Sequence, residues 1–247
     1  MEKRRGRKAY ARRRKKRIIM LSFNLLVISI ILLAIVAFKT VKTKANIDGR
    51  RPDIDVQLLT VNKYSRPGIE SDKITGVVVH YTANPGSTAK ENRDYFESLK
   101  DGHDTSVSSH FVIGLDGEII QCVPTWELAY ASNERNHDTV SIECCHPDDT
   151  GKFKWKTYNS LVSLTSYLCL KYDLTEEDVI RHYDVTGKMC PKYYVENEDK
   201  WVEFKKDVKN AMKNTDLSAL EWKELLPGKN KLVIIKVETK DRKCEVR

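Results

Sequence analysis

The hydrophobic and polar positions along the chain divide it into distinct parts. Residues 18–38 form an uncharged run of 21 residues, rich in Ile, Leu and Val. At about 1.5 Å rise per residue, a helix of this run spans roughly 30 Å, the thickness of a bilayer's hydrocarbon core. Residues 39–55 are polar, lack an apolar period, and predict a linker. From 56 to 213, short apolar runs alternate with amphipathic stretches, so we predict one folded domain there.

Strand and helix patterns interleave within this domain. The run 77–79 follows Gly76 and predicts a buried strand, and two apolar runs flanking Asp116-Gly117 predict a hairpin. The predicted strands are 77–79, 110–115, 118–123, 139–144 and 179–180, and the predicted helices are 87–100, 157–172 and 198–213. This order predicts an α/β fold with a central mixed β-sheet flanked by helices. Residues 214–247 contain a strand-like run at 232–237 and form a C-terminal extension of unknown role.

The net charge of +8 is concentrated at the N-terminus. Residues 1–17 hold eleven Lys or Arg and one Glu, whereas the remaining 230 residues hold 32 basic and 34 acidic groups. The globular part is therefore not basic, and we expect no nucleic-acid partner. The positive-inside rule predicts a cytoplasmic tail at 1–17, a single transmembrane anchor at 18–38 and an extracellular domain. A cleaved signal peptide is the alternative, although its apolar region is normally shorter, about 7–15 residues.

Three residues of metal-binding types follow predicted strands or lie in loops: His80, His182 and Cys190. Two imidazoles and a thiolate suit zinc and leave a fourth tetrahedral position for water. Zinc lowers the pKa of a bound water to about 7 and polarises a carbonyl, which is the chemistry that amide hydrolysis needs. A hydrogen-bonded histidine at a strand end and a buried structural cysteine are the alternative, and the spacing alone leaves both open. The adjacent Cys144 and Cys145 point to opposite faces of a strand, so no bond between them is expected.

Four segments carry a resemblance to a known family: VVVHYTAN (77–84), SSHFVIGLDGEIIQCVP (108–124), SIEC (141–144) and RHYDVTGKMCP (181–191). They resemble the zinc N-acetylmuramoyl-L-alanine amidases, a superfamily that includes phage lysozyme-type amidases, AmpD-like amidases and animal peptidoglycan recognition proteins. The similarity covers about residues 56–210. It implies a zinc amidase domain at 56–213 that cuts the bond between N-acetylmuramic acid and L-alanine in bacterial peptidoglycan. We expect a monomer anchored in the cell membrane and facing the cell wall.

The resemblance also implies residue roles. His80, His182 and Cys190 match the zinc ligands, and Lys188 occupies a cationic position that stabilises an oxyanion. Phage lysozyme-type members carry a catalytic Tyr where this chain has Ser109, whereas the AmpD-like branch uses a Glu that corresponds to Glu143. Two rivals remain: a peptidoglycan-binding module without catalysis, and a thiol hydrolase that uses Cys190 with a histidine.

Alternation along the strand 139–144 bears on the choice of general base. Val140, Ile142 and Cys144 share the face that suits the core, so Glu143 lies on the other and can point into a polar cleft. A solvent-exposed carboxylate on an edge strand is the alternative.

Further residues are expected around the site. His110 matches a family histidine beside the site, and we expect a second-shell or substrate contact. Thr82, Asn84 and Asn133 are expected to contact substrate. His103, His137 and His146 lie in loop-like segments and are expected to be solvated.

Overall fold

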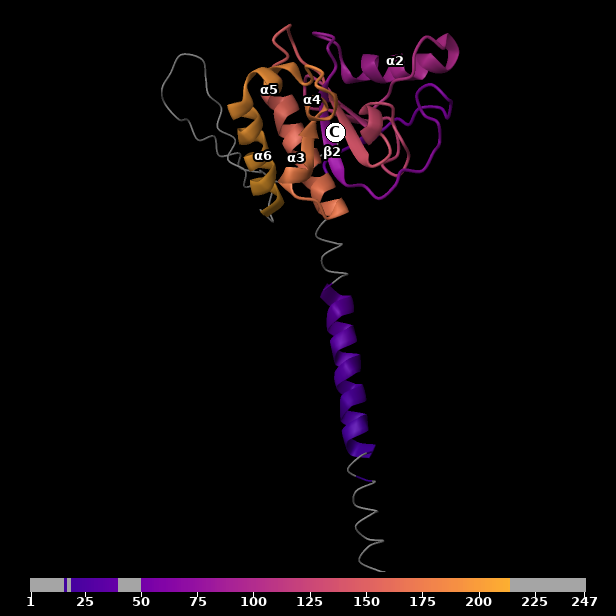
Figure 1. Ribbon diagram of the computed structural model, residues 1–247, viewed down its shortest axis with the longest axis vertical. Helices are drawn as coiled ribbons and strands as arrows, with labels where there is room; N and C mark the ends of the chain where they lie inside the picture. The colour runs from indigo at the N-terminus through magenta and orange to yellow at the C-terminus, as the bar shows by residue number, and fades with distance from the viewer. Residues whose placement is uncertain (1–15, 17–18, 40–49, 214–247) are drawn as a thin grey trace, which may run out of the picture. The chain divides into compact units, whose positions relative to one another are not determined.

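The computed structural model describes residues 16, 19–39 and 50–213, and the chain divides into two units, Met1–Gly49 and Arg50–Arg247. In the first unit, Ile19–Lys39 form one helix of 21 residues that is long and apolar enough to cross a membrane (Figure 1). A membrane anchor and a signal sequence share these features, so the helix fits both alternatives. Most of the basic tail and of the predicted linker, and the strand-like run 232–237, lie outside the described residues.

The second unit contains a mixed six-stranded sheet with flanking helices, which confirms the predicted α/β fold. The strands are β1 (Asp55–Val56), β2 (Gly76–Tyr81), β3 (Phe111–Ile113), β4 (Ile119–Gln121), β5 (Thr139–Cys144) and β6 (Val179–Arg181). The α-helices are α2 (Ala89–Gly102), α3 (Trp155–Tyr172), α4 (His182–Thr186), α5 (Lys192–Glu196) and α6 (Glu198–Lys213), and the 3₁₀ turns are η1 (Asn133–Arg135) and η2 (Glu176–Asp178). The strand order is β1-β4-β3-β5-β2-β6. Among these six strands of the described residues, β3 and β4 pair antiparallel and the other neighbours pair parallel.

Helices cover the two faces of the sheet unequally. On one face α3 packs across β2, β3 and β5, and α6 packs against α3 (Figure 1). Here Phe204 of α6 is fully buried and lies edge-on to the Tyr158 ring at 5.9 Å. On the other face α2 covers the β3–β4 half, where Phe96 joins a buried cluster with Val112 and Ile120. The β5–β2–β6 half of that second face is the part on which the candidate site lies.

The ends of α2 follow the sequence closely. Thr88 is the N-cap, and its side chain and that of Glu91 form a reciprocal capping box. His103 ends the helix in the left-handed conformation, with φ at 60°. The predicted helix 87–100 and the observed helix therefore differ by only two residues at each end.

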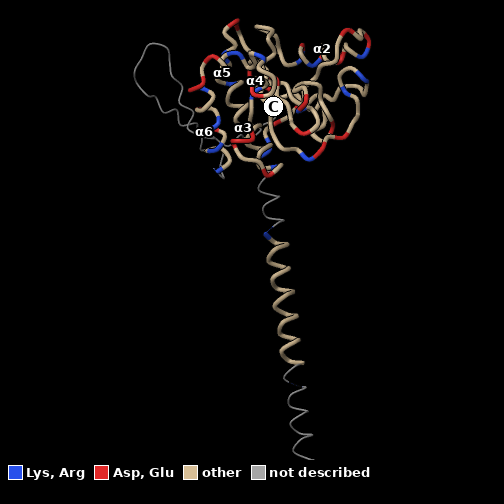
Figure 2. The backbone as a smooth tube through the Cα atoms, in the orientation of Figure 1, with Lys and Arg blue, Asp and Glu red and all other residues tan. Residues whose placement is uncertain are grey.

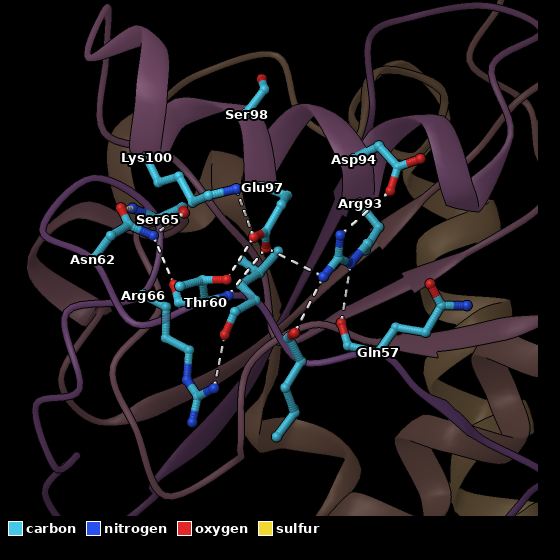
Figure 3. A network of polar contacts seen from close by, with 12 residues as sticks. Gln57, Thr60, Asn62, Ser65, Arg66, Arg93, Asp94, Glu97, Ser98 and Lys100 are labelled. Atoms are coloured by element: carbon cyan, nitrogen blue, oxygen red, sulfur yellow. Dashed lines mark hydrogen bonds and ion pairs between the residues drawn. The ribbon is translucent and has the colours of Figure 1, made fainter.

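A polar network joins α2 to the extended segment before β2 (Figure 3). Glu97 accepts hydrogen bonds from the Thr60 amide at 3.0 Å, the Thr60 hydroxyl at 2.6 Å and Lys100 at 3.0 Å. Arg93 bonds to Glu97 and also donates to the Gln57 and Leu58 carbonyls. In the same segment the Gln57 amide donates to the Gln121 carbonyl of β4, and the Leu59 amide donates to the Cys122 carbonyl just after that strand. The network therefore fastens the first residues of the domain to the sheet.

Glu97 gives a test of this network. Partial burial alone raises the pKa of Glu97, but the Thr60 and Lys100 hydrogen bonds and the Arg93 charge outweigh it and lower the pKa to about 2. Replacing Glu97 by Gln should lower the free energy of unfolding at pH 7 by about 1 kcal/mol, since hydrogen bonds to a charged group are lost at a partly exposed site. A depressed folded pKa stabilises above the unfolded value near 4.5, so the difference should shrink as the pH falls from about 4.5 towards 2.

Urea unfolding followed by tryptophan fluorescence measures this difference, because all four tryptophans follow residue 49. Asp101→Asn is a matched control, since the Asp101 side chain is 76% exposed at the end of the same helix. An equal loss of stability in both variants at pH 7 would show that the network adds nothing specific.

Two short helices were not predicted from the sequence. Residues 182–186 and 192–196 lie outside the predicted strands and helices, but they form α4 and α5. The Asp184 carboxylate accepts from the Arg181 amide at 2.8 Å and caps the first turn of α4, and Gly187 ends it with φ at 78°. Helices of five residues are too short to show a period of 3.6, which is why pattern alone misses them.

Charges of both signs are intermixed over the second unit (Figure 2). The five described cysteines are all buried and free. Cys144 and Cys145 therefore do not bond to each other, as their positions on a strand predicted.

Candidate active site

The candidate site lies where the parallel strands β2, β5 and β6 end. His80 is near the end of β2, Glu143 near the end of β5, and His182 directly follows β6. The carboxyl ends of parallel strands meet at one edge of a sheet, which is where open α/β sheets bind ligands. The turn after α4 then carries Cys190 back to His182, since the Tyr183 amide donates to the Cys190 carbonyl at 2.9 Å.

His80, His182 and Cys190 come together as the sequence predicted. One ligand atom of each lies within 4.8 Å of the other two, and all three side chains are buried. His80 Nδ1 is 3.8 Å from Cys190 Sγ, and the two imidazole rings lie 4.7 Å apart at 64°. His182 Nδ1 is buried without a hydrogen-bond partner among the described residues. Buried polar atoms normally have a hydrogen-bond partner, so the free Nδ1 of His182, close to His80 and Cys190, fits a ligand position for a metal ion.

The distal nitrogens of both imidazoles are hydrogen bonded. His80 Nε2 lies 3.2 Å from Ser132 Oγ, and His182 Nε2 lies 2.9 Å from Asn133 Oδ1. Ser132 was not anticipated, because it lies in a loop without periodicity and only its neighbour Asn133 was expected near the site. Asn133 was expected to contact substrate, and the structure brings its side chain to His182.

The electrostatics of the site favour neutral imidazoles. Burial, with the charges of His182 and Lys188, lowers the pKa of His80 well below its ordinary value. Burial and Lys188 lower the pKa of His182 in the same direction. Neutral imidazole is the form that binds a metal. Burial, aided by the Glu143 carboxylate, raises the pKa of Cys190 to about 12, so the thiol rival would begin from a protonated and poorly nucleophilic group.

Glu143 faces the same site. In the register of the sheet it lies opposite His80 on β2, and in-register neighbours share a face. Its Oε1 atom is 4.0 Å from His80 Nδ1, and its Oε2 atom is buried without a hydrogen-bond partner among the described residues. Burial raises the pKa of Glu143 to about 8, and the Lys188 charge opposes the rise. A carboxylate with this pKa is suited to accepting a proton near neutral pH.

Lys188 lies within electrostatic reach of the cluster. Its charge lowers the pKa values of His80, His182 and Glu143, although the residue itself is exposed. The exposed ammonium group of Lys188 can therefore stabilise negative charge that develops on the carbonyl oxygen of a bound substrate.

The other residues expected near the site, His110, Thr82 and Asn84, differ in burial and in whether their polar atoms are already hydrogen bonded. His110 is 1% exposed, and both its ring nitrogens are engaged, by Ser141 and by the Glu127 carbonyl. Thr82 Oγ1 is buried without a hydrogen-bond partner among the described residues, and Asn84 is exposed at the next turn. Thr82 therefore has a free polar atom to offer, whereas His110 is held inside the sheet.

The expectation that His146 is solvated was wrong. Its side chain is 1% exposed, and its ring lies 5.0 Å from that of Tyr81. Its Nδ1 atom bonds to the Asp148 carbonyl at 2.8 Å. The residue lies in a loop, but the loop folds back over β2, so packing rather than local pattern sets its exposure.

Comparison with known proteins links this site to one family. The family model described as N-acetylmuramoyl-L-alanine amidase matches residues 70–193, which include His80, Glu143, His182 and Cys190. The N-acetylmuramoyl-L-alanine amidase CwlL of Bacillus licheniformis is 31% identical over 172 residues, which cover 64% of this chain and 47% of the relative. BlyA of Bacillus subtilis, with the same description, is 32% identical over 181 residues, covering 65% and 48%. The chain thus spans about half the length of these curated relatives.

Solved structures agree with this similarity. PlyL superposes with a TM-score of 0.56 at 26% identity, over 65% of this chain and 99% of that one. The catalytic domain of XlyA superposes with a TM-score of 0.55, also at 26% identity, over 64% of this chain and 99% of that one. The part of this chain that folds around the candidate site is therefore similar to nearly the whole of each of these solved chains.

Proposed function

Because the chain belongs to the N-acetylmuramoyl-L-alanine amidase family, we propose that it is a zinc-dependent amidase. Its substrate is the amide bond between N-acetylmuramic acid and L-alanine in bacterial peptidoglycan. The observation that carries the proposal is the meeting of three donor atoms within 4.8 Å of one another, inside the family match and beside a buried carboxylate.

The donor set fits zinc. Two neutral imidazoles and one sulfur are borderline-soft ligands, and three protein ligands leave a position for water or substrate, as in catalytic zinc sites. The unpartnered Nδ1 of His182 supports the same fit. A zinc ion held by His80, His182 and Cys190 supplies a water of lowered pKa and polarises the substrate carbonyl.

Two residues of the chain then have separate roles, one in proton transfer and one in charge stabilisation. Glu143 accepts the proton of the attacking water at its carboxylate and returns it to the nitrogen of the departing L-alanine. Lys188 places its ammonium near the carbonyl oxygen and stabilises the negative charge that develops there. Thr82, Asn84 and Asn133 are the proposed substrate contacts, whereas His110 supports the site from inside the sheet.

The cellular arrangement is also a proposal. Residues 1–17 form a cytoplasmic tail, 18–38 a membrane anchor and 39–55 a linker, so that the catalytic domain, 56–213, faces the cell wall. The basic N-terminal flank and the apolar helix Ile19–Lys39 support this orientation. We propose that the protein acts as a monomer.

Digestion of purified peptidoglycan tests the reaction. The full-length, zinc-loaded protein in mild detergent should release free L-alanine amino groups and no new reducing sugars. Chelation should stop the release and added zinc should restore it, whereas a thiol hydrolase would resist chelation and yield to alkylation. Binding to the peptidoglycan without any release by the zinc-loaded protein would instead identify a recognition module.

A further inference from the structure

One turn of the chain contacts both candidate histidine ligands. Residues 131–136 connect the β4 side of the sheet to β5, and they carry Ser132 and Asn133 side by side. Ser132 reaches the distal nitrogen of His80, and Asn133 reaches that of His182. His80 lies on β2 and His182 directly follows β6, so this turn is a common support for candidate ligands that are 102 residues apart in the sequence.

We propose that Ser132 and Asn133 are positioning residues: Asn133 fixes the tautomer and the ring orientation of His182, and Ser132 fixes the ring orientation of His80. An amide oxygen only accepts hydrogen bonds, so the contact of Asn133 Oδ1 requires His182 Nε2 to carry the proton. The lone pair of neutral His182 then lies on Nδ1, the buried atom without a partner. Ser132 Oγ, which can accept or donate, holds the His80 ring through Nε2, and Nδ1 of the same ring faces Cys190. The inference rests on the proposed zinc site but not on which bond the enzyme cuts.

The turn is built to hold these two groups still. Asn136 Oδ1 accepts from the Ala131 amide at 2.9 Å and the Ser132 amide at 2.5 Å. Ser132 is 1% exposed, and Asn133 has φ at 52°, the left-handed conformation that asparagine tolerates better than most residues. A loop with its own side-chain hydrogen bonds loses little freedom when it orients a ligand.

The turn is also fastened to the strands that carry the site. The Thr139 hydroxyl, at the start of β5, donates to the Arg135 carbonyl at 2.6 Å. Arg135 pairs with Asp138 at 2.8 Å and donates to the Thr75 hydroxyl at 3.0 Å, just before β2. These contacts attach the turn 131–136 to β2 and β5, the strands that carry His80 and Glu143.

The backbone conformation decides the choice of variants. Asn133→Gly removes the acceptor without strain, since glycine adopts positive φ readily. Asn133→Asp keeps an acceptor oxygen, and Ser132→Ala removes the hydroxyl that contacts His80 with little change of volume. Ser166→Ala is the matched control, because it removes a hydroxyl that is 3% exposed on α3, outside the site.

Zinc affinity of the full-length protein, measured by competition with a chromophoric chelator, is the first test. Asn133→Gly and Ser132→Ala should each weaken zinc binding by about 10-fold to 100-fold, the usual effect of removing an outer partner of a metal-bound histidine. Asn133→Asp and Ser166→Ala should bind zinc like the unaltered protein. Unchanged affinity in both Asn133→Gly and Ser132→Ala, or an equal loss in Asn133→Asp, would overturn the proposal.

The nitrogen chemical shifts of the histidine rings in the metal-free protein are the second test. His182 should hold its proton on Nε2 in the unaltered protein and in Asn133→Asp, and should show mixed tautomers in Asn133→Gly. His110 is an internal control, because its Nδ1 accepts from the Ser141 amide and its Nε2 bonds to the Glu127 carbonyl in every variant. A lower melting temperature with an unchanged His182 tautomer would mean a merely structural role. This test keeps its meaning even if the protein cuts no peptidoglycan.

Discussion

Replacing Cys190 by Ala removes one of three ligands, and we expect it to abolish tight zinc binding and lower peptidoglycan cleavage by roughly a thousandfold. Polarisation of the carbonyl by a metal is worth several kcal/mol, and each tenfold in rate corresponds to about 1.4 kcal/mol. Zinc content after dialysis and release of dye from labelled cell walls measure the two effects. Cys169→Ala is the matched control, since Cys169 is equally buried and free but lies on α3, away from the site.

The Cys190 and Cys169 variants separate the possible outcomes. Loss of zinc and activity in Cys190→Ala, with both retained in Cys169→Ala, supports the ligand assignment. Full activity of Cys190→Ala would remove the cysteine from both the zinc site and the thiol alternative. Activity that is lost while stoichiometric zinc remains bound would mean that Cys190 is not a ligand.

Replacing Glu143 by Gln should leave zinc bound and lower the cleavage rate by about 10²- to 10⁴-fold, the usual contribution of a general acid–base residue. The amide has nearly the same shape as the carboxylate but cannot accept the water proton. Glu143→Gln is informative because the Glu143 carboxylate is largely buried and lies 4.0 Å from His80 Nδ1. Glu177→Gln on η2, where the side chain is 75% exposed, is the control.

Zinc content and cleavage rate measured on the same Glu143→Gln preparation settle the assignment. A folded, zinc-loaded Glu143→Gln protein with unaltered activity would make Glu143 a bystander and would return the search for a base to other groups at the site. Loss of zinc together with activity would mean that the carboxylate acts on the metal site and not on the proton.

The pattern of hydrophobic and polar positions predicts most of the fold, because most of the helices and strands are long enough to show their period. The strand 139–144 and the helix 198–213 have the predicted bounds. Alternation also placed Val140, Ile142 and Cys144 in the core, where each is fully buried. Glu143 consequently lies on the opposite face, but its partner His80 follows from the register of two parallel strands whose first residues, Gly76 and Thr139, are 63 residues apart, and no local pattern encodes that register.

Other features depend on tertiary packing. Ser132 lies in an aperiodic loop, and its importance appears only when the loop lies against β2 and α4. His146 was expected to be solvated because it lies in a loop-like segment, yet it is buried and its ring packs against that of Tyr81. The short helix α4 is bounded by the Asp184 cap and by Gly187, which are local features rather than a period. The order of His80, His182 and Cys190 and the family resemblance identified candidates, and the fold brought them together.

The mass of the products from one defined substrate tests the central claim most directly. A soluble muropeptide, in which N-acetylmuramic acid is joined to a stem peptide, is incubated with the full-length, zinc-loaded protein. The masses of the products are measured by mass spectrometry. We predict two products, the free sugar acid and a peptide that begins with an unblocked L-alanine, whose masses together exceed the substrate by one water. Cleavage within the peptide, or a substrate that is bound but left intact, would contradict the account.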